Sequence, residues 1–216
     1  MSLRFSKVLL VIIVLIMVFT IGCSNKNSDN DKIAYISPNI DSEYQNTFEE
    51  LNLGILFDFN LKLPKADKSW VDIWVEGYTD GKAMDDFPIA HLSYGLSPEI
   101  LEEGHMGFGI INPNRKETQL FLYAPSASLY PDITDNKFLS KSGISTWDYA
   151  IEDETIALKS GEEKVLAVYR HGEEELRTYD LNDESSINKI INEDKTVLLL
   201  KIKAEEKDEN NLKVED

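Results

Sequence analysis

Residues 54–63 read GILFDFNLKL and residues 70–79 read WVDIWVEGYT, and these two runs decide the fold class. In the first run, large apolar residues occupy every second position: Ile55, Phe57, Phe59, Leu61 and Leu63. This period of two predicts a strand with one face in the core. The second run is rich in β-branched and aromatic residues, which favour strands. Because only Pro64 and a short polar segment separate the runs, we expect an antiparallel hairpin, with a turn at Asp80-Gly81 closing the unit.

Similar short runs continue along the chain, punctuated by Gly and Pro. They predict strands over residues 89–95, 105–112, 117–124, 146–151, 154–158, 163–171, 174–180 and 196–203. Short helices are expected over residues 42–51, 97–103 and 184–193, the last capped by Ser185 or Ser186. The connections are too short for the crossover helices of a parallel sheet. The chain is therefore predicted to be mainly β: an antiparallel β-sandwich, loosely immunoglobulin-like, with one or two short helices.

The first 23 residues have a different character. Arg4 and Lys7 precede an apolar run from Val8 to Ile21, which is shorter than a usual membrane span. Gly22 and Cys23 follow this run. This is the pattern of a secretory signal. Its end, Thr20-Ile21-Gly22-Cys23, resembles the lipobox of bacterial lipoproteins. The resemblance implies cleavage before Cys23 and a diacylglycerol on its thiol; the alternative is an uncleaved anchor that leaves the domain on the same side of the membrane.

These features predict a linear organisation: a signal peptide (1–22), a flexible tether (23–32), a β-sandwich (33–203) and an acidic disordered tail (204–216). Anchored at Cys23, the domain would stand at the outer face of the bacterial cytoplasmic membrane. The net charge of −17 argues against nucleic acid as a partner. Besides the membrane itself, the expected partner is a protein or glycan of the cell envelope. Cys23 is the only cysteine, so no intramolecular disulfide is expected.

The second run also suggests a ligand surface. Trp70, Trp74 and Tyr78 alternate with Asp72 and Glu76 in sequence steps that place all five on one face of a strand. On such a face the rings can stack on the apolar C–H faces of a sugar while the carboxylates accept hydrogen bonds from its hydroxyl groups. The alternative is that the rings lie in the core beneath a loop or helix, as large aromatic residues usually do.

Two groups of residues suggest metal sites. Asp80, Asp85 and Asp86 offer hard oxygen ligands, so they suggest calcium as a cofactor, although the spacing is not that of an EF-hand. The alternative is a solvated turn. If the strands at 89–95 and 105–112 pair, His91 and His105 would come close, as in a zinc or copper site of a metal-dependent hydrolase. The alternative is two separate surface histidines.

Motifs for other chemistry are weak. The chain contains no GxSxG, HExxH, P-loop or dinucleotide-binding motif. Ser186 to Lys189 match S-x-x-K, but the K-S-G sequences at 141–143 and 159–161 precede this motif instead of following it. We therefore expect a binding or assembly module and not an enzyme, with a carbohydrate-binding module as the alternative.

Overall fold

The computed structural model describes residues 31–113, 117–135 and 142–207. The predicted signal peptide, Cys23 and nearly all of the tether lie outside the described residues, as do residues 208–216 of the predicted tail. Among the described residues, no helix is long and apolar enough to cross a membrane. The compact unit described below begins at Lys32.

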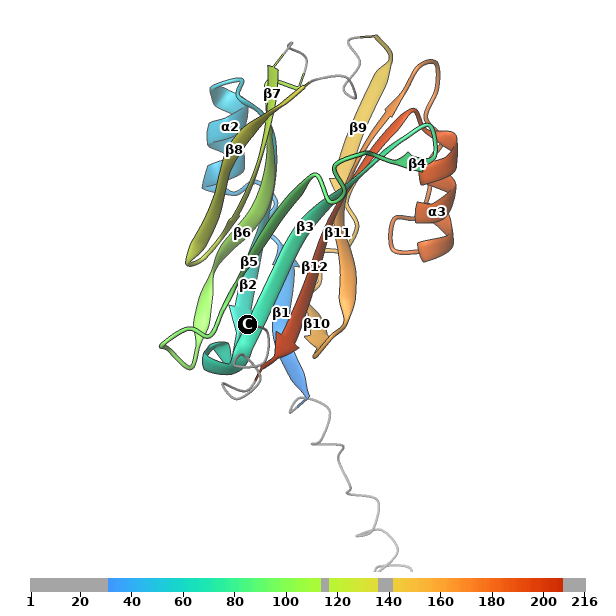
Figure 1. Cartoon of the computed structure of the whole chain (residues 1–216). Coiled ribbons are helices and arrows are strands. Elements are labelled where there is room, and N and C mark those ends of the chain that lie inside the picture. Colours follow the sequence, from blue (N-terminus) through green and yellow to red (C-terminus); the bar gives the residue numbers. More distant parts are fainter. Residues whose placement is uncertain (1–30, 114–116, 136–141, 208–216) are drawn as a thin grey trace, which may run out of the picture. The chain divides into compact units, whose positions relative to one another are not determined.

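The described residues form two antiparallel sheets packed face to face (Figure 1), which confirms the predicted β-sandwich. Sheet A has the order β10-β1-β2-β6-β7-β8. Its strands are β1 (Lys32–Pro38), β2 (Gly54–Leu63), β6 (Glu102–Ile111), β7 (Glu117–Ala124), β8 (Ala127–Asp135) and β10 (Ile156–Lys159). Sheet B has the order β4-β3-β12-β11-β9, and β5 pairs with β3. Its strands are β3 (Ser69–Thr79), β4 (Lys82–Ala83), β5 (Ala90–Gly95), β9 (Ile144–Tyr149), β11 (Glu163–Gly172) and β12 (Thr196–Glu206).

The core fills the space between the sheets. Sheet A contributes the inward face of β2 together with Met106, Phe108 and Ile110 of β6. Sheet B contributes alternate residues of β3 and β12, and along β3 buried and half-buried residues alternate strictly from Ser69 to Gly77. The period of two that predicted the strands is thus the period at which side chains enter this core.

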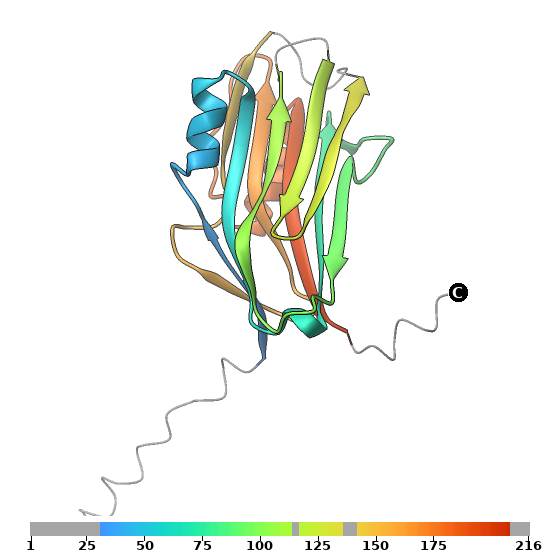
Figure 2. The same ribbon diagram turned by 90° about the vertical axis from the view of Figure 1, so that its left-hand side faces the viewer.

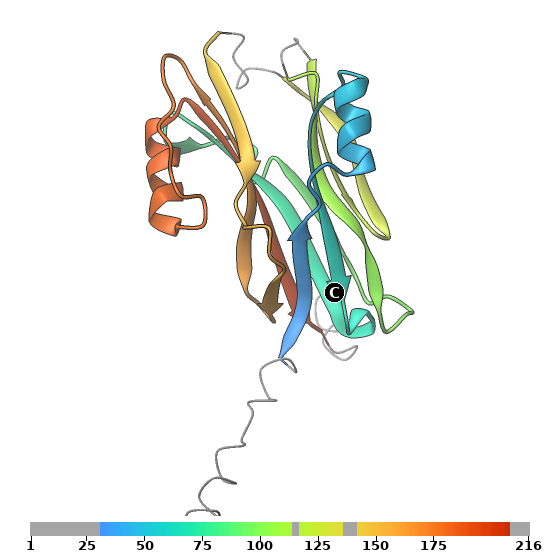
Figure 3. The same ribbon diagram turned by 180° about the vertical axis from the view of Figure 1, so that it is seen from behind.

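Each sheet carries one short helix on its outer face, as Figures 2 and 3 show. Helix α2 (Glu43–Glu50) covers part of sheet A, and Ser42 caps it by accepting a hydrogen bond from the Gln45 amide at 3.2 Å. Helix α3 (Glu184–Glu193) covers sheet B through a second apolar cluster: Ala150, Val168, Ile187, Ile190, Val197 and Leu199. The prediction of both helices is confirmed, but the cap of α3 is Asp183 instead of Ser185 or Ser186. Asp183 accepts hydrogen bonds from both of those serines and so satisfies the first free amides of the helix.

The predicted hairpin between the first two runs is wrong. Strand β2 pairs with β1 and β6, whereas β3 pairs with β12 and β5 in the other sheet. A short 3₁₀ turn, η1 (Ala66–Lys68), carries the chain across, and its Ala66 amide donates to the carbonyl of Ile100 at 2.7 Å. Both runs are central strands with two long-range partners each, which leaves neither an edge free for the other. The Asp80-Gly81 turn is confirmed and joins β3 to the short β4, with a positive φ at both residues.

Other boundaries differ from prediction in smaller ways. The sequence pattern did not reveal β1 or β8, and β8 lies between the predicted strands 117–124 and 146–151, where no strand was expected. Residues 97–103 contain no helical turn, and residues 174–180 form no strand. Strand β12 runs to Glu206, with Ala204 buried, so the sandwich extends beyond residue 203 into the predicted tail.

Candidate functional site

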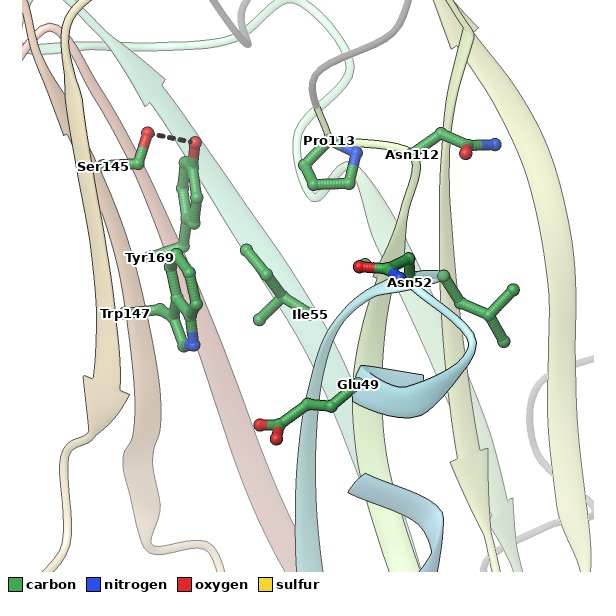
Figure 4. A pocket seen from close by; sticks show the side chains of 10 residues that line it. Glu49, Asn52, Ile55, Asn112, Pro113, Ser145, Trp147 and Tyr169 are labelled. Carbon is green, nitrogen blue, oxygen red and sulfur yellow. Dashed lines mark hydrogen bonds between the residues drawn. The ribbon is translucent and has the colours of Figure 1, made fainter. Parts of the chain in front are cut away.

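A pocket of about 530 Å³ opens between the two sheets at the end of the sandwich where β2 begins and β6 ends. Figure 4 shows its two walls facing each other. Residues from β9 and β11 form the wall of sheet B, and the end of α2, the start of β2 and the end of β6 form the wall of sheet A. The lining residues are Glu49, Asn52, Leu53, Gly54, Ile55, Asn112, Pro113, Ser145, Trp147 and Tyr169.

The wall of sheet B is aromatic. Trp147 of β9 lies directly opposite Tyr169 of β11 in the strand register, so the two rings are neighbours across the strands. Tyr169 is buried, but Trp147 is 49% exposed. Inward-facing residues of a sandwich are normally covered by the other sheet; Trp147 is not, because the pocket separates it from the opposite wall.

A hydrogen-bonded row fixes the top of this wall. The hydroxyl groups of Ser145 and Tyr169 are 2.9 Å apart, and Ser145 Oγ also contacts His171 Nδ1 at 3.0 Å. His171 is buried, and its Nε2 has no partner among the described residues. Burial raises the pKa of Tyr169, so its phenol stays protonated at neutral pH and Tyr169 presents a neutral ring to the pocket.

Two tight turns build the wall of sheet A. Asn52 follows the last residues of α2 with φ 51°, and Asn112 follows β6 with φ 54°. Asparagine tolerates this left-handed conformation better than most residues, which explains its presence at both turns. The backbone amide of Asn112 donates to the Leu53 carbonyl at 2.9 Å, so the two turns are joined by their backbones and both asparagines line the pocket. In Figure 4 the Asn52 side chain faces the aromatic wall, whereas that of Asn112 points away from it.

Four polar side chains of this pocket are not engaged with the described part of the protein. Among residues 31–113, 117–135 and 142–207, the side chains of Glu49, Asn52, Asn112 and Trp147 make no hydrogen bond or ion pair. The pocket therefore combines an open aromatic face with amide and carboxylate groups that are free to bind a ligand. Pockets of this size with apolar walls and a few polar groups are typical of small-molecule sites.

The predicted ligand residues of β3 lie elsewhere, on the outer face of sheet B, and are half-buried. Lysine side chains lie over the two tryptophan rings. Lys201 Nζ lies 5.2 Å from the centre of the Trp74 ring, and Lys207 Nζ lies 4.7 Å from the centre of the Trp70 ring. Tyr78 packs against the apolar cluster beneath α3. The rings thus lie neither in the main core nor on an open platform.

The carboxylates of that face are also engaged. Glu76 accepts hydrogen bonds from Trp74 Nε1 at 3.1 Å, from the Tyr78 hydroxyl at 2.8 Å and from Lys201 Nζ at 3.0 Å. Burial alone would raise the pKa of Glu76, but these three hydrogen bonds together outweigh it and lower the pKa. Asp72 accepts hydrogen bonds from His91 and Ser93 of β5. Little of this face is left to bind a sugar.

The predicted calcium ligands are spread along an exposed segment. Asp80 forms an ion pair with Lys195 at 2.9 Å, while Asp85 and Asp86 are exposed. In the part of the chain that the structure describes, no three His, Cys, Asp or Glu side chains are grouped closely enough to hold a metal ion. Calcium binding at these residues stays a prediction that the arrangement of the side chains does not favour.

The two histidine strands do not pair, so the condition for a shared metal site is not met. His91 lies on β5, which pairs with β3 in sheet B, whereas His105 lies on β6 in sheet A. The two histidines therefore belong to different clusters, and a shared zinc or copper site loses its geometric basis.

His105 instead belongs to a polar cluster beneath α2. Asp58 is fully buried and accepts hydrogen bonds from Asn39 at 2.9 Å, from His105 Nδ1 at 2.9 Å and from the Tyr123 hydroxyl at 2.8 Å. Gly107 lies between Asp58 and Tyr123 in the register, and a Cβ there would be 2.5 Å from the Tyr123 hydroxyl oxygen. The cluster is satisfied internally, which fits a structural role in joining α2 to the sheet.

The S-x-x-K match has a structural explanation. Ser186 is buried at the start of α3, and its hydroxyl donates to Asp183 at 2.9 Å, while Lys189 is exposed. The serine thus supports the helix cap.

Sequence reasoning missed the residues of the pocket. Trp147 and Tyr169 lie 22 positions apart in the chain, and Asn52 and Asn112 lie 60 positions apart; only the register of β9 with β11, and of β2 with β6, brings each pair together. The local signal was limited to Asn52, a residue typical of the position after a helix end.

Comparisons of the chain with protein-family models, curated proteins and solved structures give no match in any of the three.

Proposed function

We propose that this chain is an envelope-associated binding module, anchored through Cys23, that binds a component of the cell envelope in the pocket between its sheets. The observation that carries the proposal is the pocket wall made by Trp147, which is half exposed and faces Glu49 and Asn52, whose side chains have no partner within the described part of the protein. A volume of about 530 Å³ suits a small ligand or the end of a polymer better than a flat protein surface.

The anchor is supported by the sequence of residues 1–23, which resembles a lipoprotein signal. A lipidated cysteine would supply two acyl chains, enough for stable attachment to a membrane. We expect the wild-type protein in the membrane fraction of a lipoprotein-processing bacterium, carrying a lipid adduct detectable by mass spectrometry of the N-terminal peptide. Cys23→Ser should abolish the adduct; an unmodified cysteine in the wild-type protein would contradict the proposed anchor.

The pocket can be tested without knowing the ligand. The chain has three tryptophans, so the indole N–H signals in a ¹H–¹⁵N NMR spectrum provide one reporter in the pocket and two on the outer face of sheet B. Trp147→Phe assigns the pocket signal. We expect a low-molecular-weight extract of the cell envelope to shift the Trp147 signal and leave those of Trp70 and Trp74 unchanged.

Two results would contradict the proposed site. A shift confined to Trp70 and Trp74 would restore the strand face as the ligand surface. No shift of any indole signal, at extract concentrations that saturate a millimolar site, would remove the pocket as a binding site.

A further inference from the structure

We propose that the pocket binds a sugar ring, neutral or amino-substituted, with an apolar C–H face against the Trp147 indole. This inference rests on the proposed function and specifies the ligand class of the same pocket.

The aromatic wall provides the first reason. Among the described residues, no cation and no second aromatic ring lies over the Trp147 indole, in contrast to Trp70 and Trp74. Trp147 is half exposed and lines the pocket beside the ring of Tyr169. A flat apolar ring face next to polar groups matches a pyranose, which has a C–H face and a rim of hydroxyl groups.

The polar groups provide the second reason. The side-chain amide of Asn52 offers donors and an acceptor, and the Ser145 hydroxyl lies on the opposite wall. Hydroxyl groups of a sugar both donate and accept, so they can pair with both groups. A purely apolar ligand would cover the Asn52 amide and leave it without a partner, which costs binding free energy.

Charge restricts the kind of sugar. Among the described residues that line the pocket, Glu49 is the only charged one, and in Figure 4 its carboxylate points toward the Trp147 side. Since no lysine, arginine or histidine is among these described lining residues, they offer no cationic partner to a phosphate or uronate, and the net charge of −17 repels such a ligand further. A neutral sugar avoids this repulsion, and an amino sugar gains an attraction.

The test compares three sugars that share one ring configuration and carry a positive, a zero and a negative charge. Glucosamine, glucose and glucuronate, each also in the galacto configuration, are titrated by calorimetry into the full chain, held in a zwitterionic detergent that has no sugar headgroup. We expect the amino sugar to bind about two- to fivefold more tightly than the neutral sugar, and the uronate to bind more weakly by a similar factor, because Glu49 is exposed and its charge is screened.

Variants locate both effects. Trp147→Ala should weaken all binding by about tenfold or more. Glu49→Gln should remove the difference in affinity among the three sugars, while binding of the neutral sugar persists. Glu99→Gln makes the same change in net charge in the β5–β6 connection, at the other end of the sandwich in Figure 1, and should leave this difference intact.

The outcomes separate this inference from the function on which it rests. If no sugar binds while the envelope extract still shifts the Trp147 indole signal, the pocket binds another ligand class and the sugar inference fails alone. Sugar binding that survives Trp147→Ala also overturns it. If neither sugar nor extract acts on the pocket, the proposed function fails with it.

Discussion

Two regions of the molecule combine aromatic rings of sheet B with carboxylates, and they differ in what the rings and carboxylates contact. On the outer face, Lys201 and Lys207 lie over the rings of Trp74 and Trp70, and Glu76 accepts three hydrogen bonds. In the pocket, Trp147 is half exposed and Glu49 has no partner among the described residues. The same residue types therefore stabilise the fold in one place and are available to a ligand in the other.

This difference shows that the residue types in a strand do not by themselves indicate a binding surface. On the outer face, β12 lies beside β3 and places Lys201 directly across from Trp74. Lys207, which follows the end of β12, lies over the ring of Trp70. In the pocket, the neighbour of β9 is β11, which contributes Tyr169 and no cation to the lining. The neighbouring strand decides whether an aromatic residue is covered.

The largest effect that separates the regions is expected from removing their carboxylates. Glu76→Ala leaves Trp74, Tyr78 and Lys201 without their shared acceptor, and bonds to a charged acceptor are worth about 1.5–3 kcal/mol each. We expect a loss of about 3 kcal/mol in the free energy of unfolding, measured by urea denaturation. The matched variant Glu49→Ala should change it by less than about 0.5 kcal/mol. Equal losses in the two variants would mean that Glu49 is also a structural residue.

The second effect concerns the tryptophans. Trp74→Ala should destabilise the domain by about 2 kcal/mol, because it removes a half-buried ring and its bond to Glu76, and should leave ligand binding unchanged. Trp147→Ala should show the reverse: it should lower the free energy of unfolding by about 1 kcal/mol or less and cause the loss of binding described above. Thermal melts measure the stability of both variants, and calorimetric titrations measure their ligand binding. If the Trp147→Ala variant fails to fold, Trp147 is needed for the stability of the domain.

A third effect depends on pH. The folded-state pKa of Glu76 lies below its ordinary value of 4.5, since the hydrogen bonds from Trp74, Lys201 and Tyr78 outweigh burial. A carboxyl group with a lowered pKa stabilises the folded state above that ordinary value, and the contribution disappears as the pH falls through the folded pKa. The free energy of unfolding should therefore fall between pH 5 and about pH 3 more steeply in the wild-type protein than in Glu76→Gln. Parallel curves over this range would argue against the lowered pKa.

The smallest effect is one of accessibility in the unliganded protein. Acrylamide should quench the fluorescence of Trp147 more than that of Trp70 and Trp74, whose rings carry lysine side chains. Comparing wild-type protein with Trp147→Phe isolates the contribution of Trp147. If quenching is unchanged in the variant, the indole is not open to solvent and the pocket is narrower than described.

The sequence by itself determined the class of the fold and the position of most strands. Alternation in residues 54–63 and 70–79 reports which side chains enter a core, because in a strand side chains point alternately to opposite faces. Other local signals, such as helix-capping residues and the Asp-Gly pair, identified both helices and the Asp80-Gly81 turn. These features depend on a few neighbouring residues, so they can be predicted without knowing any partner.

Only the tertiary structure decided the strand partners and the site. Nothing local indicated that β2 and β3 belong to different sheets, nor that α2 would bury Asp58 on the polar face of β2. The pocket depends on the same long-range choices, since its two walls come from opposite sheets and its aromatic pair from the register of β9 with β11. A period of two specifies which face is apolar but not which strand lies beside it, and the lateral neighbours determined which tryptophan remained open.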